Sequence, residues 1–536
     1  MRIPFIGGSD EGRSAPWNAA RSINFFVEMG SQDSKSPAAL VGTPGTELFA
    51  TFPTGPIRMF HVMGNRCFVV ARAHLYELYA NGTYSASLGT FAIPTETAIV
   101  AVDNGVSAYG VGGNQILMLV NGLGYVFNVL TNTLTLITDA NFPANAHQVA
   151  FLDGYFIVTS RDMTFSVCEL YNGLVWPSLA TAAAIAAPDN IQKPFGSNQV
   201  LYLVKDSTTE VWQDVAVPTS QGCPFAHIPG SLVNFGTAAA RSVARVGDTV
   251  FMLGTTRVQD SAVYFGVVSV SGTSVQKVST PAIDYRISRL VSLSDAISYS
   301  YVDEGHLFYV LTFPTDDITF VYDVTTQQWH ERSTHVEGVL FEQHRHLSNE
   351  YVFFGGKHLV SHYSEPKIYE MSSRFYDDDG VPIISVRTAQ PIFDENENDN
   401  TKIFKLIIDA ETGGEVGVGT TPGGPSVSPS NIFADSAPNV FADDGGNVWL
   451  DTGVVVSVPV SGFSDLPPTA WLSWSNDGGR TWSSEYSSSL GKRGEFRTRL
   501  IWRRLGSPRN RIFRLKISDP VKKVLLGAVV NNGVKA

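Results

Sequence analysis

Short apolar runs of strand length recur along the first 380 residues, and this repetition constrains the fold more than any other feature of the chain. Each run ends in an aromatic residue followed by a turn sequence, as residues 75–79 do before Asn81 and Gly82. The aromatic markers follow one another at intervals of 41 to 58 residues, at Tyr76, Tyr125, Tyr171, Trp212, Tyr264, Tyr322 and Tyr369. A four-stranded propeller blade occupies about 40–50 residues. The spacing therefore predicts a β-propeller of six or seven blades.

The units also have the internal pattern of blades. A second apolar run precedes the marked one, as 66–71 precedes 75–79 and 306–311 precedes 320–324. Both runs are apolar at successive positions, which predicts two inner strands of one blade that pack against neighbouring blades on both faces. The alternative is a set of unrelated meanders in a sandwich.

Composition agrees with an all-β fold. Charged residues make up 16% of the chain, against roughly 25% in an ordinary soluble domain. Long exposed helices need Glu, Lys and Arg on their outer faces, so this scarcity disfavours a helical protein. The 48 glycines and 28 prolines supply many turns, and an apolar fraction of 43% excludes general disorder.

The repeat fades near residue 380, which divides the chain into three expected parts. Residues 1–45 form an N-terminal segment that we expect to join a platform domain, and 46–380 form the propeller, with the longest insertion at about 181–235. Residues 381–536 are expected to form a separate C-terminal β platform domain. It contains a Gly/Pro/Ser-rich loop at 411–447.

Charge is distributed unevenly between these parts. The chain carries a net charge of −12, but residues 470–536 contain fourteen Lys or Arg and four Asp or Glu, which is +10. The other 469 residues therefore carry −22. An acidic total argues against a protein that coats nucleic acid, whereas a basic end predicts docking to an acidic surface. The candidate docking face consists of Arg497, Arg499, Arg503, Arg504, Arg509 and Arg511.

The sharpest short motif is the Asp-box-like segment 475–482. Its pattern positions are Ser475, Asp477, Gly479, Thr481 and Trp482. The aspartate can accept hydrogen bonds from turn amides, and glycine permits the positive φ that a hairpin turn needs. Sialidases carry several such boxes on their propeller blades, but this chain has one, outside the repeat region. We interpret it as a structural turn, and an Asp-box propeller glycosidase is the enzymatic alternative.

No catalytic constellation, cofactor motif or metal site is predicted. His344, His346, His358 and His362 share strand faces but lack a supporting Asp, Glu or Cys at ligand spacing. The three cysteines, Cys67, Cys168 and Cys223, form no CxxC motif, so we expect three small buried side chains rather than a disulfide framework. The chain has no signal peptide and no run of 18 apolar residues, so we expect synthesis in a cytoplasm and no stable membrane association.

Several segments in order resemble one family, the packaged-DNA stabilisation or tail-hub (nozzle) proteins of short-tailed bacteriophages. The resemblance runs from about residue 20 to 520. The segments that carry it are 21–28, 40–45, 242–248, 280–284, 304–311, 322–332, 474–482 and 503–506. Their order and spacing carry the resemblance, and the family's motifs are architectural, so no catalytic residue is transferred.

The resemblance implies a non-enzymatic virion protein of a phage tail, made in the host bacterial cytoplasm. It implies a homo-oligomeric ring of six subunits below the portal and adaptor, a propeller with a platform domain, and contacts with a tail needle, fibres or spikes. It also implies that packaged double-stranded DNA is retained by the ring and passes through its channel during ejection. A carbohydrate- or receptor-binding tail module is the second alternative, and it predicts monomers or trimers rather than rings.

Overall fold

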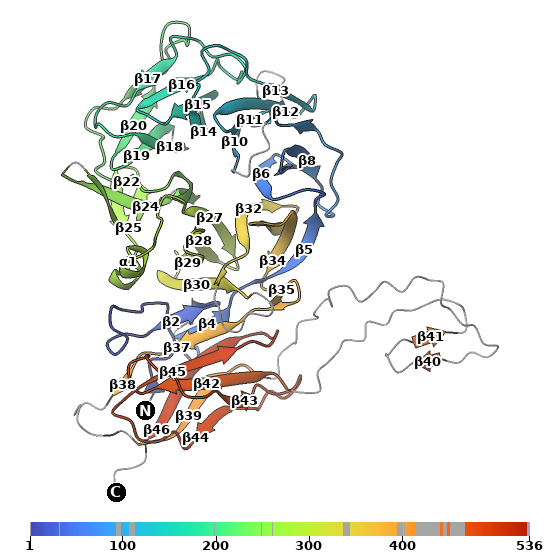
Figure 1. Cartoon of the computed structure of the whole chain (residues 1–536), viewed down its shortest axis with the longest axis vertical. Helices are drawn as coiled ribbons and strands as arrows, with labels where there is room; N and C mark the ends of the chain where they lie inside the picture. The colour runs from blue at the N-terminus through green and yellow to red at the C-terminus, as the bar shows by residue number, and fades with distance from the viewer. Residues whose placement is uncertain are drawn as a thin grey trace.

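Seven β-sheets follow one another around a ring, and a two-sheet sandwich adjoins the ring on one side (Figure 1). The structure is a computed structural model. It describes residues 2–31, 33–92, 98–106, 113–197, 199–247, 249–259, 261–335, 344–393, 400, 402–412, 440–442, 448–450 and 467–532. Most of the expected loop at 411–447 lies outside the described residues. The ring confirms the predicted propeller, with seven blades.

Blades 1 to 4 are four-stranded antiparallel sheets that follow one another in sequence. Blade 1 contains β6 (Ile57–Met63), β7 (Arg66–Ala71), β8 (His74–Leu78) and β9 (Gly89–Thr90). Blade 2 contains β10 (Val100–Asp103), β11 (Gln115–Val120), β12 (Leu123–Asn128) and β13 (Thr133–Leu136). Blade 3 contains β14 (Ala146–Leu152), β15 (Tyr155–Ser160), β16 (Thr164–Val167) and β17 (Thr181–Ala183). Blade 4 contains β18 (Ile191–Ser197), β19 (Val200–Lys205), β20 (Thr209–Asp214) and β21 (Phe225–His227).

Blades 5 to 7 depart from this simple order. Blade 5 contains β22 (Gly236–Thr237), β23 (Ala244–Val246), β24 (Thr249–Val258), β25 (Ser261–Ser271) and β26 (Ser274–Lys277), with the 3-10 helix η1 (Ala240–Ser242). Blade 6 contains β27 (Ile297–Asp303), β28 (His306–Phe313), β29 (Ile318–Asp323) and β30 (Gln328–Thr334), with β31 (His344–Arg345) paired to β30. Blade 7 contains β32 (Ser348–Phe354), β33 (Lys357–His362) and β34 (Lys367–Ser372), followed by β5 (Gly45–Thr51), β35 (Asp377–Asp378) and β36 (Val381–Pro382). Because β5 pairs with β34, a strand from near the N-terminus completes the last blade.

Two features of the sequence interpretation need correction. Tyr171 has φ +55° and lies in a turn, and the third strand of its blade is β16 instead. The other six aromatic markers do lie in the third strand of their blades. Residues 181–235 are not an insertion, because they contain β17 and the whole of blade 4. Trp212, one of the aromatic markers, lies in β20 of this blade, so the blade belongs to the repeat.

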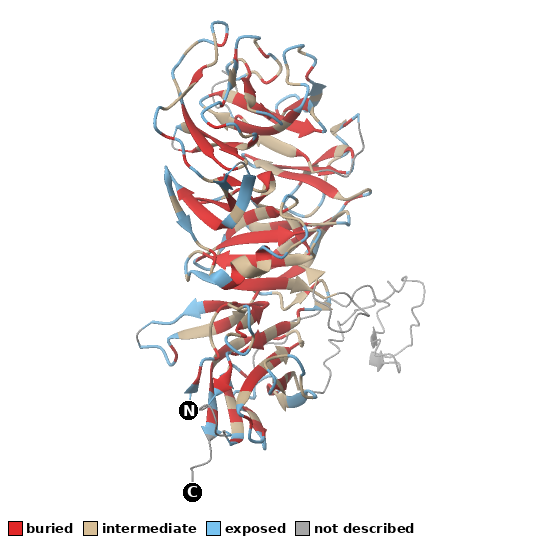
Figure 2. Cartoon of the chain, turned by 60° about the vertical axis from the view of Figure 1, so that its left-hand side comes forward, coloured by how far each residue is buried: buried red, intermediate tan, exposed pale blue. Residues whose placement is uncertain are grey.

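Alternate residues of one strand fill the two spaces on either side of a blade. In β28, Tyr309 and Leu311 pack with Phe251 of blade 5, whereas Phe308 and Val310 pack with Val360 of blade 7. Successive side chains of a strand point to opposite faces of the sheet, so a strand covered on both faces must be apolar at consecutive positions. Figure 2 shows the result as buried strands stacked blade against blade.

The sandwich is formed by both ends of the chain. One sheet has the order β3 (Phe25–Met29), β4 (Ala38–Gly42), β46 (Val524–Asn532), β39 (Ile403–Ala410) and β44 (Leu500–Arg503), with β1 (Arg2–Ile3) paired to β46. The other has the order β2 (Arg21–Ile23), β37 (Ser385–Thr388), β45 (Asn510–Ile517), β42 (Thr469–Ser475) and β43 (Tyr486–Ser489), with β38 (Ile392–Phe393) paired to β45. Leu406 and Leu525 from the first sheet meet Leu472 and Phe513 from the second in one buried core. Strands β40 (Val440–Ala442) and β41 (Val448–Leu450) form a separate hairpin.

Propeller and sandwich share one continuous sheet, because β2 pairs with β30 of blade 6 on one side and with β37 on the other. Buried Glu331 lies at this junction and binds two arginines in bidentate fashion. Its carboxylate oxygens lie 2.7–2.9 Å from Arg21 and 2.5–2.9 Å from Arg286. Burial opposes ionisation of Glu331, but the two guanidinium groups hold its pKa well below the usual range. Arg286 belongs to the helix α1 (Pro281–Ile287), so this carboxylate joins three elements.

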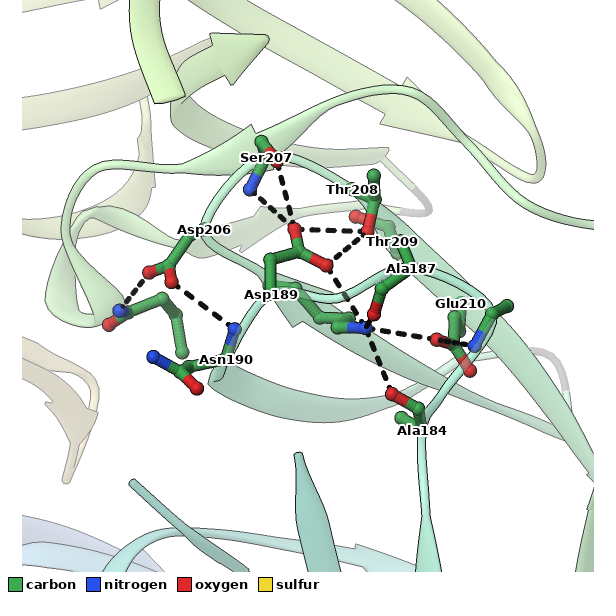
Figure 3. A network of polar contacts seen from close by, with 12 residues as sticks. Ala184, Ala187, Asp189, Asn190, Asp206, Ser207, Thr208, Thr209 and Glu210 are labelled. Atoms are coloured by element: carbon green, nitrogen blue, oxygen red, sulfur yellow. Dashed lines mark hydrogen bonds and ion pairs between the residues drawn. The ribbon is translucent and has the colours of Figure 1, made fainter. Parts of the chain in front are cut away.

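A second buried ion network holds the connection between blades 3 and 4. The Lys205 ammonium lies 3.0 Å from both Asp189 and Glu210 and donates to the carbonyl oxygens of Ala184 and Ala187 (Figure 3). Burial opposes ionisation of Asp189, but hydrogen bonds from Lys205 and the neighbouring backbone lower its pKa overall. The network holds this loop in place and gives hydrogen-bond partners to backbone carbonyl groups that would otherwise be buried without one.

Asp378 of β35, beside the junction with the sandwich, supplies a prediction about pH. Burial raises the pKa of Asp378 to about 7, although Thr46 donates a 3.0 Å hydrogen bond to it. A carboxyl group whose pKa is raised on folding takes up a proton, so its contribution to stability falls as pH rises from about 4 to about 7. At pH 8 we expect Asp378→Asn to increase the free energy of unfolding by about 1–3 kcal/mol and to raise the unfolding temperature above that of wild type. At pH 4 we expect no such gain. Thermal unfolding at both pH values, with Asp379→Asn as the control, measures this; an equal gain at both pH values would contradict it.

Candidate functional site

Five of the six arginines of the expected docking face are exposed around β44, an edge strand of the sandwich. Arg497 and Arg499 lie in the loop before this strand, Arg503 ends it, and Arg504 and Arg509 follow it. Lys405 of β39 lies opposite Arg503 in the strand register and extends the basic surface onto the next strand. Arg504 has φ +60°, and its backbone N–H donates to the carbonyl oxygen of Phe404 at 2.8 Å.

Arg511 does not belong to this face. Its side chain is 3% exposed, and its Nε donates to Asn476 Oδ1 at 2.9 Å while its Nη1 donates to the carbonyl oxygen of Leu505. The guanidinium also lies 5.2 Å from the centre of the Trp474 ring, and burial lowers its pKa to about 10. Arg511 therefore braces the turn that contains Asn476. Arg511 follows the exposed Arg509 at an alternate position, so the sequence gives no sign that its side chain is buried. In the structure both Arg511 and the next residue, Ile512, are buried.

The Asp-box-like segment forms the tip of the hairpin between β42 and β43. Asp477 accepts hydrogen bonds from the backbone N–H groups of Arg480 (3.0 Å) and Thr481 (2.9 Å), and from the Thr481 hydroxyl (2.5 Å). Ser475 Oγ donates to Asp477 and accepts the N–H of Gly479 at 2.8 Å. Gly478 and Gly479 have φ of +75° and +87°, which residues other than glycine rarely adopt.

The polar side chains of Ser475, Asp477 and Thr481 are thus engaged in shaping the turn. Trp482 packs against the Arg514 guanidinium, whose carbon lies 3.9 Å from the centre of the indole ring. The motif supplies a compact exposed tip and no pair of carboxylates such as glycoside hydrolysis uses.

The four histidines considered as ligands each hydrogen-bond within blades 6 and 7, and His362 Nδ1 accepts the backbone N–H of Glu365 at 3.0 Å. His344 Nδ1 lies 2.6 Å from Asp317, and His346 Nδ1 lies 2.7 Å from the Ser348 hydroxyl. His358 Nδ1 lies 2.9 Å from the Tyr351 hydroxyl. Across the described residues, no cluster of three or more His, Cys, Asp or Glu has the arrangement of a metal site.

The cysteines carry free thiols, with Cys67 and Cys168 buried and Cys223 half-buried. Burial raises the pKa of Cys168 to about 12 and that of Cys223 to about 11, which makes these thiols poor nucleophiles. Within the described part of the chain, no helix has the length and apolar character needed to cross a membrane.

Structural similarity to solved proteins is low. The extracellular domain of BT4673 from B. thetaiotaomicron has a TM-score of 0.39 and 9% identity over 76% of this chain, and the chain covers 45% of that protein. The Pan2 WD40 domain of Neurospora crassa has a TM-score of 0.39 and 9% identity, with 61% of this chain and 95% of that one covered. BamB from Moraxella catarrhalis has a TM-score of 0.35 and 9% identity, with 65% and 96% covered. These scores are too low to support a conclusion about this chain.

Family membership rests on the sequence as a whole. No curated protein matches the chain. A family model described as the β-propeller of bacteriophage P22 Gp10 matches residues 1–376, and a second, described as the β-sandwich of the same protein, matches residues 437–532. The two descriptions agree with the two parts seen in the structure. The chain therefore belongs to the bacteriophage P22 Gp10 family, a family of phage structural proteins.

Proposed function

We propose that this protein is a tail hub, or nozzle, of a short phage tail. In this proposal a hexameric ring lies below the portal and adaptor and continues the DNA channel. The ring retains the packaged genome and opens for ejection. Membership of a phage structural family supports the setting, and the separation of charge between the two parts of the chain carries the specific role.

The propeller and the sandwich have opposite charge. Residues 46–380 contain 30 Asp or Glu and 17 Lys or Arg, a net charge of −13. The described residues of the sandwich, including the N-terminal strands, contain 20 Lys or Arg and 10 Asp or Glu. Residues 381–536 as a whole are nearly neutral. Their acidic residues lie mainly in 394–399 and 413–466, which contain ten Asp or Glu and no Lys or Arg.

This separation suits two different neighbours. An acidic propeller surface repels phosphate, so DNA can pass it without being held by counterion release. A basic sandwich face attracts an acidic protein surface, and the exposed arginines around β44 offer bidentate donors for carboxylates. We therefore assign docking onto the adaptor or portal to the sandwich. Contacts with the tail needle, fibres or spikes are assigned to other surfaces.

The mass of the assembly tests the proposal. We expect the purified chain to form a sixfold ring when it is mixed with its adaptor–portal complex, because docking brings the subunits together at high local concentration. Light scattering of the chain alone and of the mixture measures this. Monomers or trimers whose mass does not change with the connector would contradict it and favour a receptor-binding module.

Hydrolysis of a fluorogenic sialoside tests the enzymatic alternative, an Asp-box propeller glycosidase. We expect no fluorophore release, because Asp477 is engaged in the turn. Release that is lost in Asp477→Asn would overturn the structural assignment.

A further inference from the structure

Two arginines lie against one tyrosine on the surface where the N-terminal segment meets α1. The guanidinium carbons of Arg13 and Arg289 are 5.4 and 4.5 Å from the centre of the Tyr285 ring. Neither guanidinium has an ion pair with any residue in the described part of the chain. Two like charges held near one ring repel each other, and an anionic partner would remove that cost.

Large exposed apolar side chains lie near these arginines along the chain. Trp17, which packs over Gly12 beside Arg13, is 77% exposed, and Val291 is 86% exposed. The nearby carboxylate of Asp316 accepts the backbone N–H of Val291 at 2.8 Å rather than an arginine. Arginine and aromatic residues are enriched where proteins bind one another. We call Arg13, Trp17, Tyr285, Arg289 and Val291 the arginine patch.

Three carboxylates gather elsewhere, at the ends of strands in blades 3 and 4. Burial and the nearby charge of Asp214 raise the pKa of Asp153. The backbone joins these positions, because the N–H of Tyr171, two residues after Glu169, donates to the carbonyl oxygen of Gly154 at 2.8 Å. The Tyr155 ring lies 6.1 Å from the ring of Phe225, which pairs with Asp214 in the strand register. The charges of Asp214 and Glu169 accordingly add to burial in raising the pKa of Tyr155.

Exposed apolar side chains adjoin these carboxylates. Leu170 is 48% exposed, Val215 is 40% exposed and Tyr171 is 39% exposed. We call Asp153, Glu169, Leu170, Tyr171, Asp214 and Val215 the acidic patch. Both patches therefore combine uncompensated like charges with exposed apolar area, and their charges are opposite.

The two patches lie on opposite faces of the propeller. The first strands of all the blades run in the same direction along the axis of a propeller, so their starts lie on one face and their ends on the other. Asp153 lies in the turn that directly follows β14, the first strand of blade 3. Arg289 and Val291 lie between α1 and the start of β27, the first strand of blade 6.

We propose that the arginine patch of one subunit binds the acidic patch of a second copy of this chain. Contact between two different surfaces is heterologous, and a heterologous contact closes into a ring when the rotation between subunits permits. The inference rests on the ring of the proposed function and assigns the surfaces that join its subunits. Arg13 and Arg289 pair with Asp153 and Asp214 of the neighbour, while Trp17 and Val291 cover its Leu170 and Val215.

Charge reversal on either patch tests the contact. We expect Arg13→Glu/Arg289→Glu to weaken ring formation on the connector about 100-fold, because it sets like charges against each other. Asp153→Arg/Asp214→Arg should have the same effect for the same reason. Arg72→Glu/Arg374→Glu makes the same change of charge at exposed arginines of blades 1 and 7, and it should assemble as wild type does. Light scattering and native mass spectrometry report the assembly.

Mixing the two reversed variants separates a lost contact from a misfolded chain. Each variant carries one patch that matches the altered patch of the other, so we expect the mixture to form rings in which the two variants alternate. An alternating ring contains equal numbers of the two, which native mass spectrometry resolves.

Each outcome decides the inference. If the wild type and Arg13→Glu/Arg289→Glu both form rings, the proposed contact is wrong and the proposed ring is unaffected. A wild-type chain that forms no ring on the connector overturns the proposed function itself. Unchanged assembly with loss of duplex DNA binding, measured by fluorescence anisotropy, would assign the arginine patch to phosphate instead. Failure of the mixed variants to assemble would also count against the contact.

Discussion

Replacing Glu331 with glutamine is expected to destabilise the protein more than any other single conservative change considered above. Glu331 is buried and accepts paired hydrogen bonds from Arg21 and Arg286. Glutamine keeps the shape but removes the charge, so two guanidinium groups at the junction lose their counterion. Breaking a buried ion pair by removing one partner costs about 3–5 kcal/mol, and the partial exposure of both arginines places this case near 3 kcal/mol.

The pH dependence gives this prediction a second measurement. The pKa of Glu331 is lowered on folding, so its contribution is present above the ordinary glutamate pKa of about 4.3 and is lost as pH falls towards the folded value. The difference between wild type and Glu331→Gln should therefore narrow below about pH 4. Urea unfolding at pH 7 and pH 3 measures both.

Glu411→Gln is the matched control. Glu411 pairs with Lys522 at 3.2 Å, and both side chains are more than 40% exposed. Exposed ion pairs contribute about 0–1 kcal/mol, so this variant should unfold close to wild type. Equal effects of the two substitutions would show that the junction does not depend on the buried carboxylate.

Reversal of Arg503 and Arg504 to glutamate is expected to reduce incorporation into particles at least about tenfold while each subunit stays folded. Both side chains are exposed at the end of the edge strand β44, so the substitutions leave the sandwich core unchanged. They replace two positive charges by two negative ones on the face proposed to meet an acidic connector. Like-charge contact across an interface costs several kcal/mol.

Two measurements separate docking from folding in this experiment. Complementation with the variant measures incorporation, and we expect a loss of at least about tenfold. Thermal unfolding of the isolated variant should match wild type. Arg72→Glu/Arg374→Glu, with the same change of net charge on the propeller, should be incorporated normally. Normal incorporation of Arg503→Glu/Arg504→Glu would remove the sandwich face from the proposed docking role.

Much of the propeller could be read from the sequence because its signals are local. Strands such as β28 are apolar at consecutive positions, and turns such as the one after Tyr76 contain Asn and Gly. These signals depend on residues within a few positions of one another. The same locality explains the error at Tyr171, an aromatic residue that precedes Asn and Gly but lies in a turn. The expected insertion at 181–235 was wrong although the blade marker Trp212 lies within it.

The candidate site was harder to predict for the same reason. Sequence alone indicated a basic C-terminal region, and five of the six arginines of the expected docking face are exposed. Arg511 differs because Asn476, Leu505 and Trp474 surround it, and only the folded chain brings these residues together. Glu331 also gave no sequence signal, since its two arginine partners come from β2 and α1.

The sequence by itself determined the repeating blade unit, the scarcity of charge that disfavours long helices, and the opposite charge of the propeller and the C-terminal region. The tertiary structure alone decided that β5 closes blade 7, that β2 joins blade 6 to the sandwich, and which charges are buried. Side-chain alternation and turn chemistry act between near neighbours, so they are visible along the chain. The partner of an edge strand and the counterion of a buried charge lie far away in sequence, and only folding selects them.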